Sequence, residues 1–156
     1  MCSGAYLGNL SYEMLTKACF EGYFSDLFVN AFKKLSDITT SDFDGLFYTE
    51  KSSRLSELSK DSNSDDMDFL KTLISAIIER SAFLTAEAIY AAFLSADKEK
   101  EDLPVCIACN GSTFWKTPLL KEAAERRLKE LLPAGFEIIK IDDDITKGSF
   151  AAAFIV

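Results

Sequence analysis

The residues best suited to ligand chemistry are Asn110, Gly111 and Ser112, which follow a short apolar stretch at 105–109. Glycine adopts positive φ angles and leaves room for a ligand, while serine offers a hydroxyl and a backbone N–H. The apolar stretch predicts a buried strand, and a strongly helical segment begins after Pro118. In α/β proteins, ligands bind where a strand leads into the next helix. Taken alone, the tripeptide is more typical of a turn, so its role depends on its surroundings.

A second candidate site lies at the start of the first amphipathic segment. Apolar residues at helical spacing predict a helix from about Ala5 to Phe20 that ends near Gly22. Ser3 and Gly4 precede it, and the free backbone N–H groups of a helix start suit an anion or a nucleotide. Judged locally, an ordinary Ser-Gly helix cap is the simpler interpretation.

Cys106 and Cys109 have the spacing of a redox or zinc motif, but their context disfavours both. They lie in the predicted strand, where residues three apart point to opposite faces. The chain has no second Cys-x-x-Cys pair and no His at all. The absence of His also excludes Ser-His-Asp and Cys-His catalysis, which leaves carboxylate, Lys or Arg chemistry.

The last third of the chain predicts a parallel strand pair. A helix is expected at 119–132 and a second strand at 136–141. Strand, helix and strand at this spacing predict a right-handed βαβ unit, whose two strands are parallel neighbours. The aspartates at 142–144 could bind a divalent cation, but such a run is more often merely solvated, and we favour that interpretation.

The elements between the candidate sites are predicted to be helical. Amphipathic spacing indicates a helix at 25–35, and a polar helix is expected around 54–59. Thr and Ser precede acidic residues at 38–44, which is typical of a helix cap, and capping alone would explain them. The longest tract, 65–96, is apolar on more than one face, so we expect it to be largely buried. Glu79-Arg80 interrupts it, either as a charged pair at the core edge or as a polar contact or kink at a subdomain seam.

Composition indicates one globular domain whose main partner is not a polyanion. The 156 residues are 48% hydrophobic, and 25 acidic against 17 basic residues give a net charge of −8. That charge argues against nucleic acid or an anionic membrane surface as the main partner. No apolar run approaches the ~20 residues of a membrane span and no signal-peptide pattern is present, so a cytoplasmic location is expected. The four Cys residues are too scattered for a disulfide framework.

Three stretches, in order along the chain, resemble the C-terminal half of the large domain of the hexokinase family. Residues 1–10 are similar to the family's Ser/Gly-Gly-x-Tyr-Met/Leu-Gly-Glu segment. The stretch from Asn110 to Pro118 resembles its Asp-Gly-Ser-x-Tyr-Lys-x-x-Pro motif, and 142–152 resembles the acidic, Gly- and Lys-rich lead into its Ala-rich final helix. The resemblance spans nearly the whole chain. It implies a partial actin-like, ribonuclease H-like α/β fold that is helix-rich, with a small sheet containing the parallel βαβ unit.

The resemblance also implies a nucleotide-binding cleft. By correspondence with the family's motifs, Gly4, Thr40, Gly111 and Ser112 line the adenine-nucleotide cleft, and no catalytic residue or metal ligand falls within this chain. Small residues and hydroxyls agree with that role, because they let backbone N–H groups approach a nucleotide without a formal positive charge. The parent enzyme is then expected to transfer the γ-phosphate of ATP, with Mg²⁺, to the 6-hydroxyl of a hexose.

Four residues depart from the family's pattern. Asn110 replaces an Asp and Asn9 replaces a Glu, while Ala5 stands where some members have Lys and Asp44 where Ser is common. The loss of a Lys and the gain of an Asp make the cleft less favourable for phosphate. These changes leave open an alternative function, in which a non-catalytic domain of the same fold binds a nucleotide or a protein partner.

The family's phosphate loop, Asp-x-Gly-Gly-Thr, and its catalytic Asp in an Asn-Asp pair have no counterpart here. The 156 residues contain no Gly-Gly and no Asn-Asp pair. The apolar last segment, 145–156, is predicted to be a helix that ends without a polar terminus. We therefore expect residues 1–156 to be the C-terminal, nucleotide-side segment of a longer kinase, inactive without the missing N-terminal part of the same chain.

Overall fold

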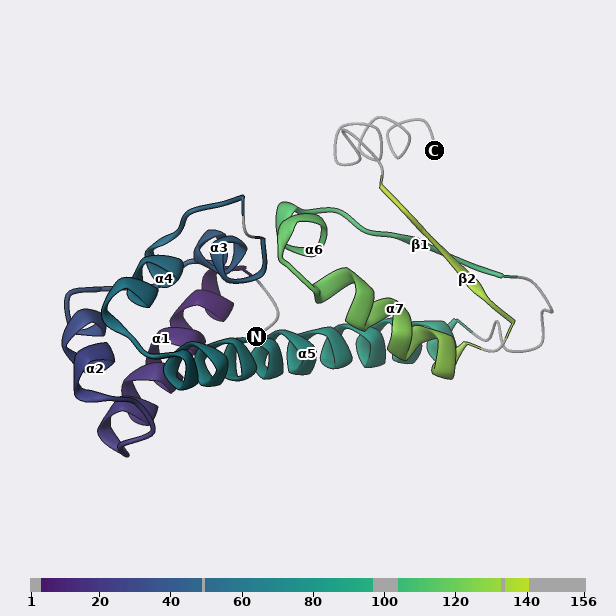
Figure 1. Cartoon of the computed structure of the whole chain (residues 1–156). Helices are drawn as coiled ribbons and strands as arrows, with labels where there is room; N and C mark the ends of the chain where they lie inside the picture. Colours follow the sequence, from purple (N-terminus) through teal and green to yellow (C-terminus); the bar gives the residue numbers. More distant parts are fainter. Residues whose placement is uncertain (1–3, 49, 97–103, 133, 141–156) are drawn as a thin grey trace.

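The computed structural model describes residues 4–48, 50–96, 104–132 and 134–140. In chain order, its elements are α1 (Gly4–Phe20), α2 (Asp26–Phe32), the 3-10 helix η1 (Thr40–Phe43), α3 (Asp44–Phe47), α4 (Arg54–Glu57), the 3-10 helix η2 (Leu58–Asp61), α5 (Ser64–Ser95), β1 (Val105–Ala108), α6 (Ser112–Lys116), α7 (Leu120–Leu131) and β2 (Phe136–Ile139). Helix α5 runs the width of the molecule (Figure 1). The helices from α1 to α4 gather toward its beginning, and α6, α7 and the two strands gather toward its end (Figure 1).

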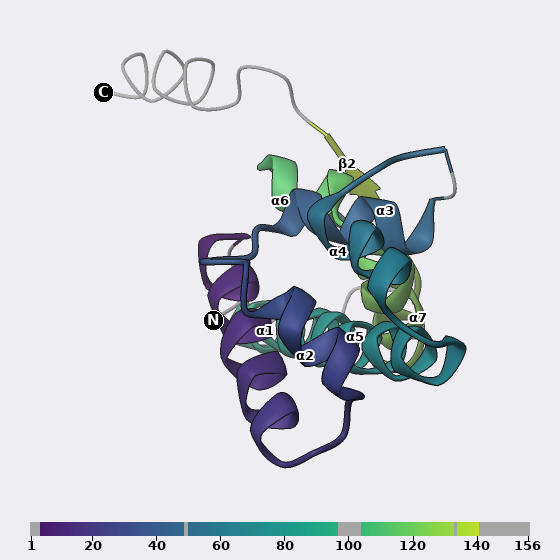
Figure 2. The same cartoon turned by 60° about the vertical axis from the view of Figure 1, so that its left-hand side comes forward.

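The main core lies where the helices from α1 to α4 meet α5, and buried residues of α6 and the start of α7 complete it. Figure 2 shows how these helices are arranged. Helix α1 turns one apolar stripe toward this core because its buried residues recur at helical spacing. The predicted helix at 5–20 is therefore confirmed, and Gly22 follows it with a left-handed φ of +79°. The largest fully buried aliphatic and aromatic side chains of this core are Leu7, Leu15, Phe28, Phe43, Leu55, Leu70, Ile74 and Ile78.

A smaller core joins the second half of α5 to α7 and the strands. Ala86, Ile107, Leu128 and Leu132 are its buried members. Strands β1 and β2 pair in parallel, with Val105 opposite Phe136, and α7 connects them. The predicted parallel βαβ unit is thus confirmed, as is a helix-rich α/β fold with a small sheet.

The expectation that the first strand is buried is wrong for one of its faces. Ile107 is buried against the helices, whereas Cys106 and Ala108, on the opposite face, are exposed. Among the described residues, the helices that pack on this sheet cover the side of Ile107, and alternate residues of β1 reach solvent.

Helix α5 is continuous but less buried than its composition predicts. Its first half buries one stripe, which includes Leu70, Ile74 and Ile78. In its second half Leu84, Ala88 and Ala92 are exposed because α7 packs along one side only. The chain stays helical through Glu79-Arg80, without the kink that was one interpretation of that pair. Instead, Glu79 accepts a hydrogen bond of 2.7 Å from Arg126 on α7.

Other predicted boundaries agree to within a few residues. Helix α2 ends at Phe32, a little before the predicted end, and α4 is followed by η2 where one polar helix was predicted at 54–59. The aspartates at 142–144 and the segment 145–156 lie outside the described residues. Among the helices that the structure describes, none combines the length and the apolar character needed to cross a membrane.

Candidate functional site

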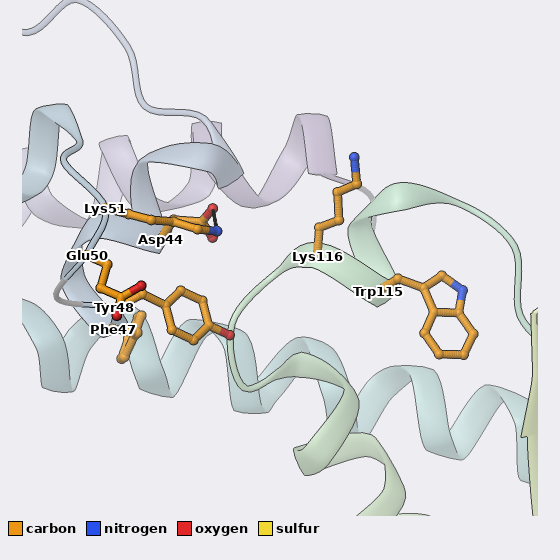
Figure 3. Close-up of a pocket in the computed structure, with 7 residues that line it drawn as sticks. All are labelled: Asp44, Phe47, Tyr48, Glu50, Lys51, Trp115 and Lys116. Carbon is orange, nitrogen blue, oxygen red and sulfur yellow. Dashed lines mark hydrogen bonds and ion pairs between the residues drawn. The ribbon is translucent and has the colours of Figure 1, made fainter.

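Two adjoining cavities lie between α3 and α6. The smaller, of about 220 Å³, is lined by Thr40, Ser41, Asp44, Ser112, Thr113, Lys116 and Thr117. The larger, of about 630 Å³, is lined by Asp44, Phe47, Tyr48, Glu50, Lys51, Trp115 and Lys116 (Figure 3). Asp44 and Lys116 line both cavities, so they mark the boundary between a hydroxyl-rich space and an aromatic one.

The wall formed by α6 depends on a sharp turn after β1. Gly111 has a φ of +101°, a conformation that L side chains rarely adopt, so glycine is required at this point. Asn110 Oδ1 accepts a hydrogen bond of 2.7 Å from the N–H of Gly111. The indole Nε1–H of Trp115 donates to the carbonyl of Cys109 at 3.1 Å and ties α6 back to the strand end. An Asp carboxylate could accept the same bond as Asn110, so the Asn preserves this turn.

The start of α1 reaches the cavities through its glycines. A Cβ on Gly4 would lie 2.7 Å from Thr113 Oγ1 and 3.5 Å from Thr40 Oγ1, so α1, η1 and α6 meet closely at this glycine. One turn later, a Cβ on Gly8 would collide with the carbonyl oxygen of Ile38. The two glycines therefore let the chain segment that leads to Thr40 lie directly on α1.

A buried carboxylate fixes the opposite wall. Asp42, 6% exposed, accepts hydrogen bonds of 2.8 Å from both the N–H and the hydroxyl of Thr39. Arg54 donates to both oxygens of Asp42, at 2.9 and 2.6 Å, and also to Asp37 at 2.7 Å. Burial raises the pKa of Asp42, but the bonds from Arg54 and Thr39 outweigh burial and lower it below its usual range. The bond to Asp42, then that to Asp37, raises the pKa of Arg54.

The charged side chains that line the two cavities differ in whether they are paired. Asp44 Oδ2 accepts a hydrogen bond of 2.6 Å from Lys51 Nζ, and this ammonium also lies 5.0 Å from the centre of the Tyr48 ring. Lys116 has no hydrogen-bond or ion-pair partner in the part of the chain that the structure describes. The two cavities are therefore lined by the paired carboxylate of Asp44, a second carboxylate on Glu50 and the unpaired ammonium of Lys116, beside a group of hydroxyls.

Comparison with protein families shows to which family the chain belongs. A family model described as hexokinase matches residues 1–155. The chain belongs to the hexokinase family. Comparison with curated proteins gave no match. Family membership carries the actin-like fold with it, as the resemblance implied, and the parallel βαβ unit agrees with that fold.

The four residues that sequence resemblance assigned to the hexokinase nucleotide cleft lie close together. Thr40 and Ser112 line the smaller cavity, Gly4 approaches Thr40, and Gly111 immediately precedes α6. The structure thus gathers them from three separate segments, while their role toward a ligand stays a prediction.

Sequence reasoning missed several members of this site. Thr113, Lys116 and Thr117 line the smaller cavity, and all belong to the stretch already matched to the hexokinase motif. Their inclusion in that motif was the available signal. The link between Asp42 and Arg54 had a weaker signal, because the capping pattern at 38–44 explains Thr39 and Asp42 but not an Arg twelve positions later.

The residues around the smaller cavity fit the nucleotide that a hexokinase uses. Three hydroxyls, from Thr40, Ser112 and Thr113, can donate to phosphate oxygens, and Lys116 adds positive charge. Because Gly4 has no side chain, α1 can approach Thr40 and Thr113 closely, in space that a Cβ would fill. For Mg²⁺, no group of three or more carboxylate, thiol or imidazole side chains able to bind a metal occurs among the described residues.

The thiols near the site do not fit redox chemistry. Cys106 and Cys109 are both free, with Cys106 exposed and Cys109 half-buried. Burial raises the pKa of Cys109, which is the opposite of the lowered pKa that a reactive thiolate needs. This disfavours redox chemistry at Cys109, as did the position of the pair in the sequence.

Proposed function

We propose that this chain forms the nucleotide side of a hexokinase-type sugar kinase, whose complete active site transfers the γ-phosphate of ATP to the 6-hydroxyl of a hexose in the cytoplasm. The observation that supports this proposal is the smaller cavity, where hydroxyls from η1 and α6 face a common space beside the start of α1. Family membership and the unpartnered Lys116 point in the same direction.

In this proposal, the chain's own residues bind and orient the nucleotide. Thr40 and Ser112 donate hydrogen bonds to phosphate oxygens, and Lys116 neutralises part of their charge. Gly4 and Gly111 keep the backbone close enough for its N–H groups to take part. ATP supplies the phosphoryl group for transfer when bound. Positioning and charge stabilisation of this kind provide most of the catalysis in phosphoryl transfer.

The remaining machinery is proposed to come from another segment of the parent kinase. The chain contains no Gly-Gly pair for a phosphate loop and no Asn-Asp pair for the catalytic base. The described sheet has two parallel strands, and one of its faces exposes Cys106 and Ala108. Parallel sheets are normally covered on both faces, so this sheet is suited to joining further structure. We therefore expect the chain alone to bind ATP and to leave hexose unphosphorylated.

The test is an ATP-binding assay on the chain combined with an assay for hexose-dependent ADP formation. We expect binding by equilibrium dialysis and no ADP signal with glucose or fructose. Thr40→Val and Ser112→Ala should each weaken binding about fivefold or more, as expected for a lost hydrogen bond to a charged group. Thr72→Val is the matched control, because Thr72 is an exposed residue of α5 that bonds only to its own helix.

Two results would contradict the proposal in different ways. Absence of ATP binding would reject the proposal that this chain binds the nucleotide. Hexose-dependent ADP formation by the chain alone would reject the proposal that the catalytic groups come from another segment. A longer parent protein that binds ATP yet phosphorylates no hexose would instead favour the non-catalytic binding domain.

A further inference from the structure

Asp44 occupies an unusual position for an acidic residue near a nucleotide. It is the first residue of α3, it lines both cavities, and its side chain is only 23% exposed. Oδ2 is bonded to Lys51, whereas Oδ1 has no hydrogen-bond donor among the residues that the structure describes. An ionised carboxylate has about four acceptor positions. Asp44 can therefore accept a further hydrogen bond from a ligand while it remains paired with Lys51.

Lys51 makes the carboxylate of Asp44 compatible with a negatively charged ligand. A bare carboxylate at the boundary of the two cavities would repel a polyphosphate. The ammonium of Lys51, 2.6 Å from Oδ2, cancels most of that charge at short range. Figure 3 shows the paired side chains of Asp44 and Lys51 together on one wall, with Trp115 and Lys116 on the other. The pair thus presents an acceptor without presenting a net negative charge.

The surroundings indicate which part of a nucleotide this acceptor meets. The smaller cavity is rich in hydroxyls and suits phosphate, whereas Phe47, Tyr48 and Trp115 line the larger cavity, and the ring of Tyr48, which extends into it in Figure 3, suits a base. Asp44 lies where the two cavities meet. A group at that point belongs to the nucleoside, because phosphate oxygens are themselves acceptors and cannot donate to a carboxylate.

We propose that Asp44 is a specificity-determining acceptor for a hydroxyl or amino donor on the nucleoside part of the ligand, and that Lys51 keeps this carboxylate compatible with the phosphates. The inference rests on the proposed nucleotide site and extends it to the choice of nucleoside. Lys51 then acts through Asp44, as a positioning and charge-compensating residue, and makes no contact with the phosphates.

The first arm of the test is a mutant cycle read with ATP. Trp115 is the only Trp of the chain and lines the larger cavity, so its fluorescence reports binding, and titration calorimetry checks the affinity. Lys51→Met should weaken ATP binding roughly tenfold when Asp44 is present, because the carboxylate is then uncompensated. In the Asp44→Ala background the same change should cost less than about threefold, since the carboxylate that Lys51 pairs with is then absent.

The second arm compares ligands. ATP, 2′-deoxy-ATP and ITP differ in the ribose hydroxyl or in the amino group of the base, so the comparison identifies the donor. We expect one of the two analogues to bind at least about tenfold more weakly than ATP to the native chain, as for a lost hydrogen bond to a charged acceptor. The Asp44→Ala variant should lose that preference, which a purely structural role of Asp44 would leave unchanged.

Controls separate folding from recognition. Lys60→Met is the matched control, because Lys60 is an exposed lysine whose ammonium lies 4.0 Å from Glu57 in an ion pair away from the cavities. Circular dichroism checks the fold of each variant, and Lys51→Gln replaces Lys51→Met if the latter does not fold.

Each outcome has a defined meaning. Equal effects of Lys51→Met in both backgrounds, or a nucleoside preference that survives Asp44→Ala, would overturn this inference while ATP binding by the native chain upheld the proposed function. Absence of ATP binding by the native chain would overturn both.

Discussion

Arg54 donates one hydrogen bond to each oxygen of the buried Asp42 carboxylate, at 2.9 and 2.6 Å. Asp42 in turn accepts two bonds from Thr39, the residue before the cavity-lining Thr40. Arg54, on α4, therefore fixes the η1 wall of the candidate site without lining it. A bidentate interaction of this kind restrains the orientation of the two side chains as well as their distance, whereas a single contact from a lysine would not.

Removal of the guanidinium should loosen that wall. For Arg54→Met we expect a loss of about 2 kcal/mol in the free energy of unfolding, because Asp42 stays buried with fewer donors. Urea unfolding measures the loss, and ATP binding should weaken as well. Arg126→Met is the control, since Arg126 forms an exposed pair with Glu79 and should change stability by less than about 1 kcal/mol. Equal losses for the two variants would contradict the structural role of Arg54.

Acid should destabilise the fold through Asp42 and Asp66. Burial raises the pKa of Asp66, but bonds from the hydroxyl and N–H of Ser25 and the N–H of Asn63 outweigh it and lower the pKa. A carboxyl whose pKa is lower in the folded state stabilises the protein above its unfolded pKa of about 3.9. That stability is lost as the pH falls through the folded pKa. We expect a nearly constant contribution from pH 7 to about 5 and a decline below about pH 4.

Urea midpoints measured across this pH range test the assignment. Asp66→Asn removes one of the two groups, so its stability should fall less steeply in acid than that of the native chain. The control is Asp68→Asn, on the same helix, at a residue for which the structure gives no side-chain hydrogen bond or ion pair in the part that it describes. A decline of the same steepness in the Asp66→Asn and native proteins would reject the role of Asp66.

Gly8 should tolerate no side chain, even though alanine is the better helix former. A Cβ at this position meets the carbonyl oxygen of Ile38, which is backbone and cannot rotate away. We expect Gly8→Ala to cost about 1–3 kcal/mol by overpacking, against about 1 kcal/mol gained in helix propensity. It should also weaken ATP binding, because the segment that leads to Thr40 must move. Asn9→Ala, at the neighbouring exposed position, is the control: it should leave ATP binding unchanged and raise stability slightly through helix propensity. A stabilised Gly8→Ala protein with native ATP affinity would contradict this close contact.

Much of the fold was predictable because it depends on local patterns. The spacing of apolar residues defined α1 and α5, and a strand, a charged helix and a second strand predicted the parallel pair. Contacts between distant segments were not predictable in the same way. The approach of Gly8 to Ile38 and the bond between Arg54 and Asp42 arise only when separate elements pack, and neither has a periodic signal.

The residues of the candidate site also divide into those that sequence patterns predicted and those that only the packing of distant segments shows. Gly111 and Ser112 could be found from a strand that ends in a turn, and Thr40 needed the family resemblance. The pairing of Asp44 with Lys51 was hidden from sequence reasoning, which treated Asp44 as a loss of phosphate affinity. Likewise, the second face of α5 looked buried by composition, because the sequence does not say on which side α7 packs.

Two buried serines should be dispensable for stability. Among the described residues, the side-chain oxygens of Ser11 and Ser81 are fully buried without a hydrogen-bond partner. Burying a hydroxyl without a partner costs roughly 1–3 kcal/mol, and alanine removes that cost while it fills most of the same space. We therefore expect Ser11→Ala and Ser81→Ala each to raise the free energy of unfolding by up to about 1 kcal/mol.

Ser25→Ala provides the matched comparison, because the hydroxyl of Ser25 donates to Asp66 at 2.6 Å and accepts from the N–H of Phe28. Its removal takes away the cap of α2 and one donor to a buried carboxylate, so we expect a loss of about 1–2 kcal/mol. Urea unfolding of the three variants therefore separates hydroxyls with partners from those without. A loss of stability in Ser11→Ala as large as that in Ser25→Ala would mean that the buried hydroxyl does make a bond, for example with a trapped water.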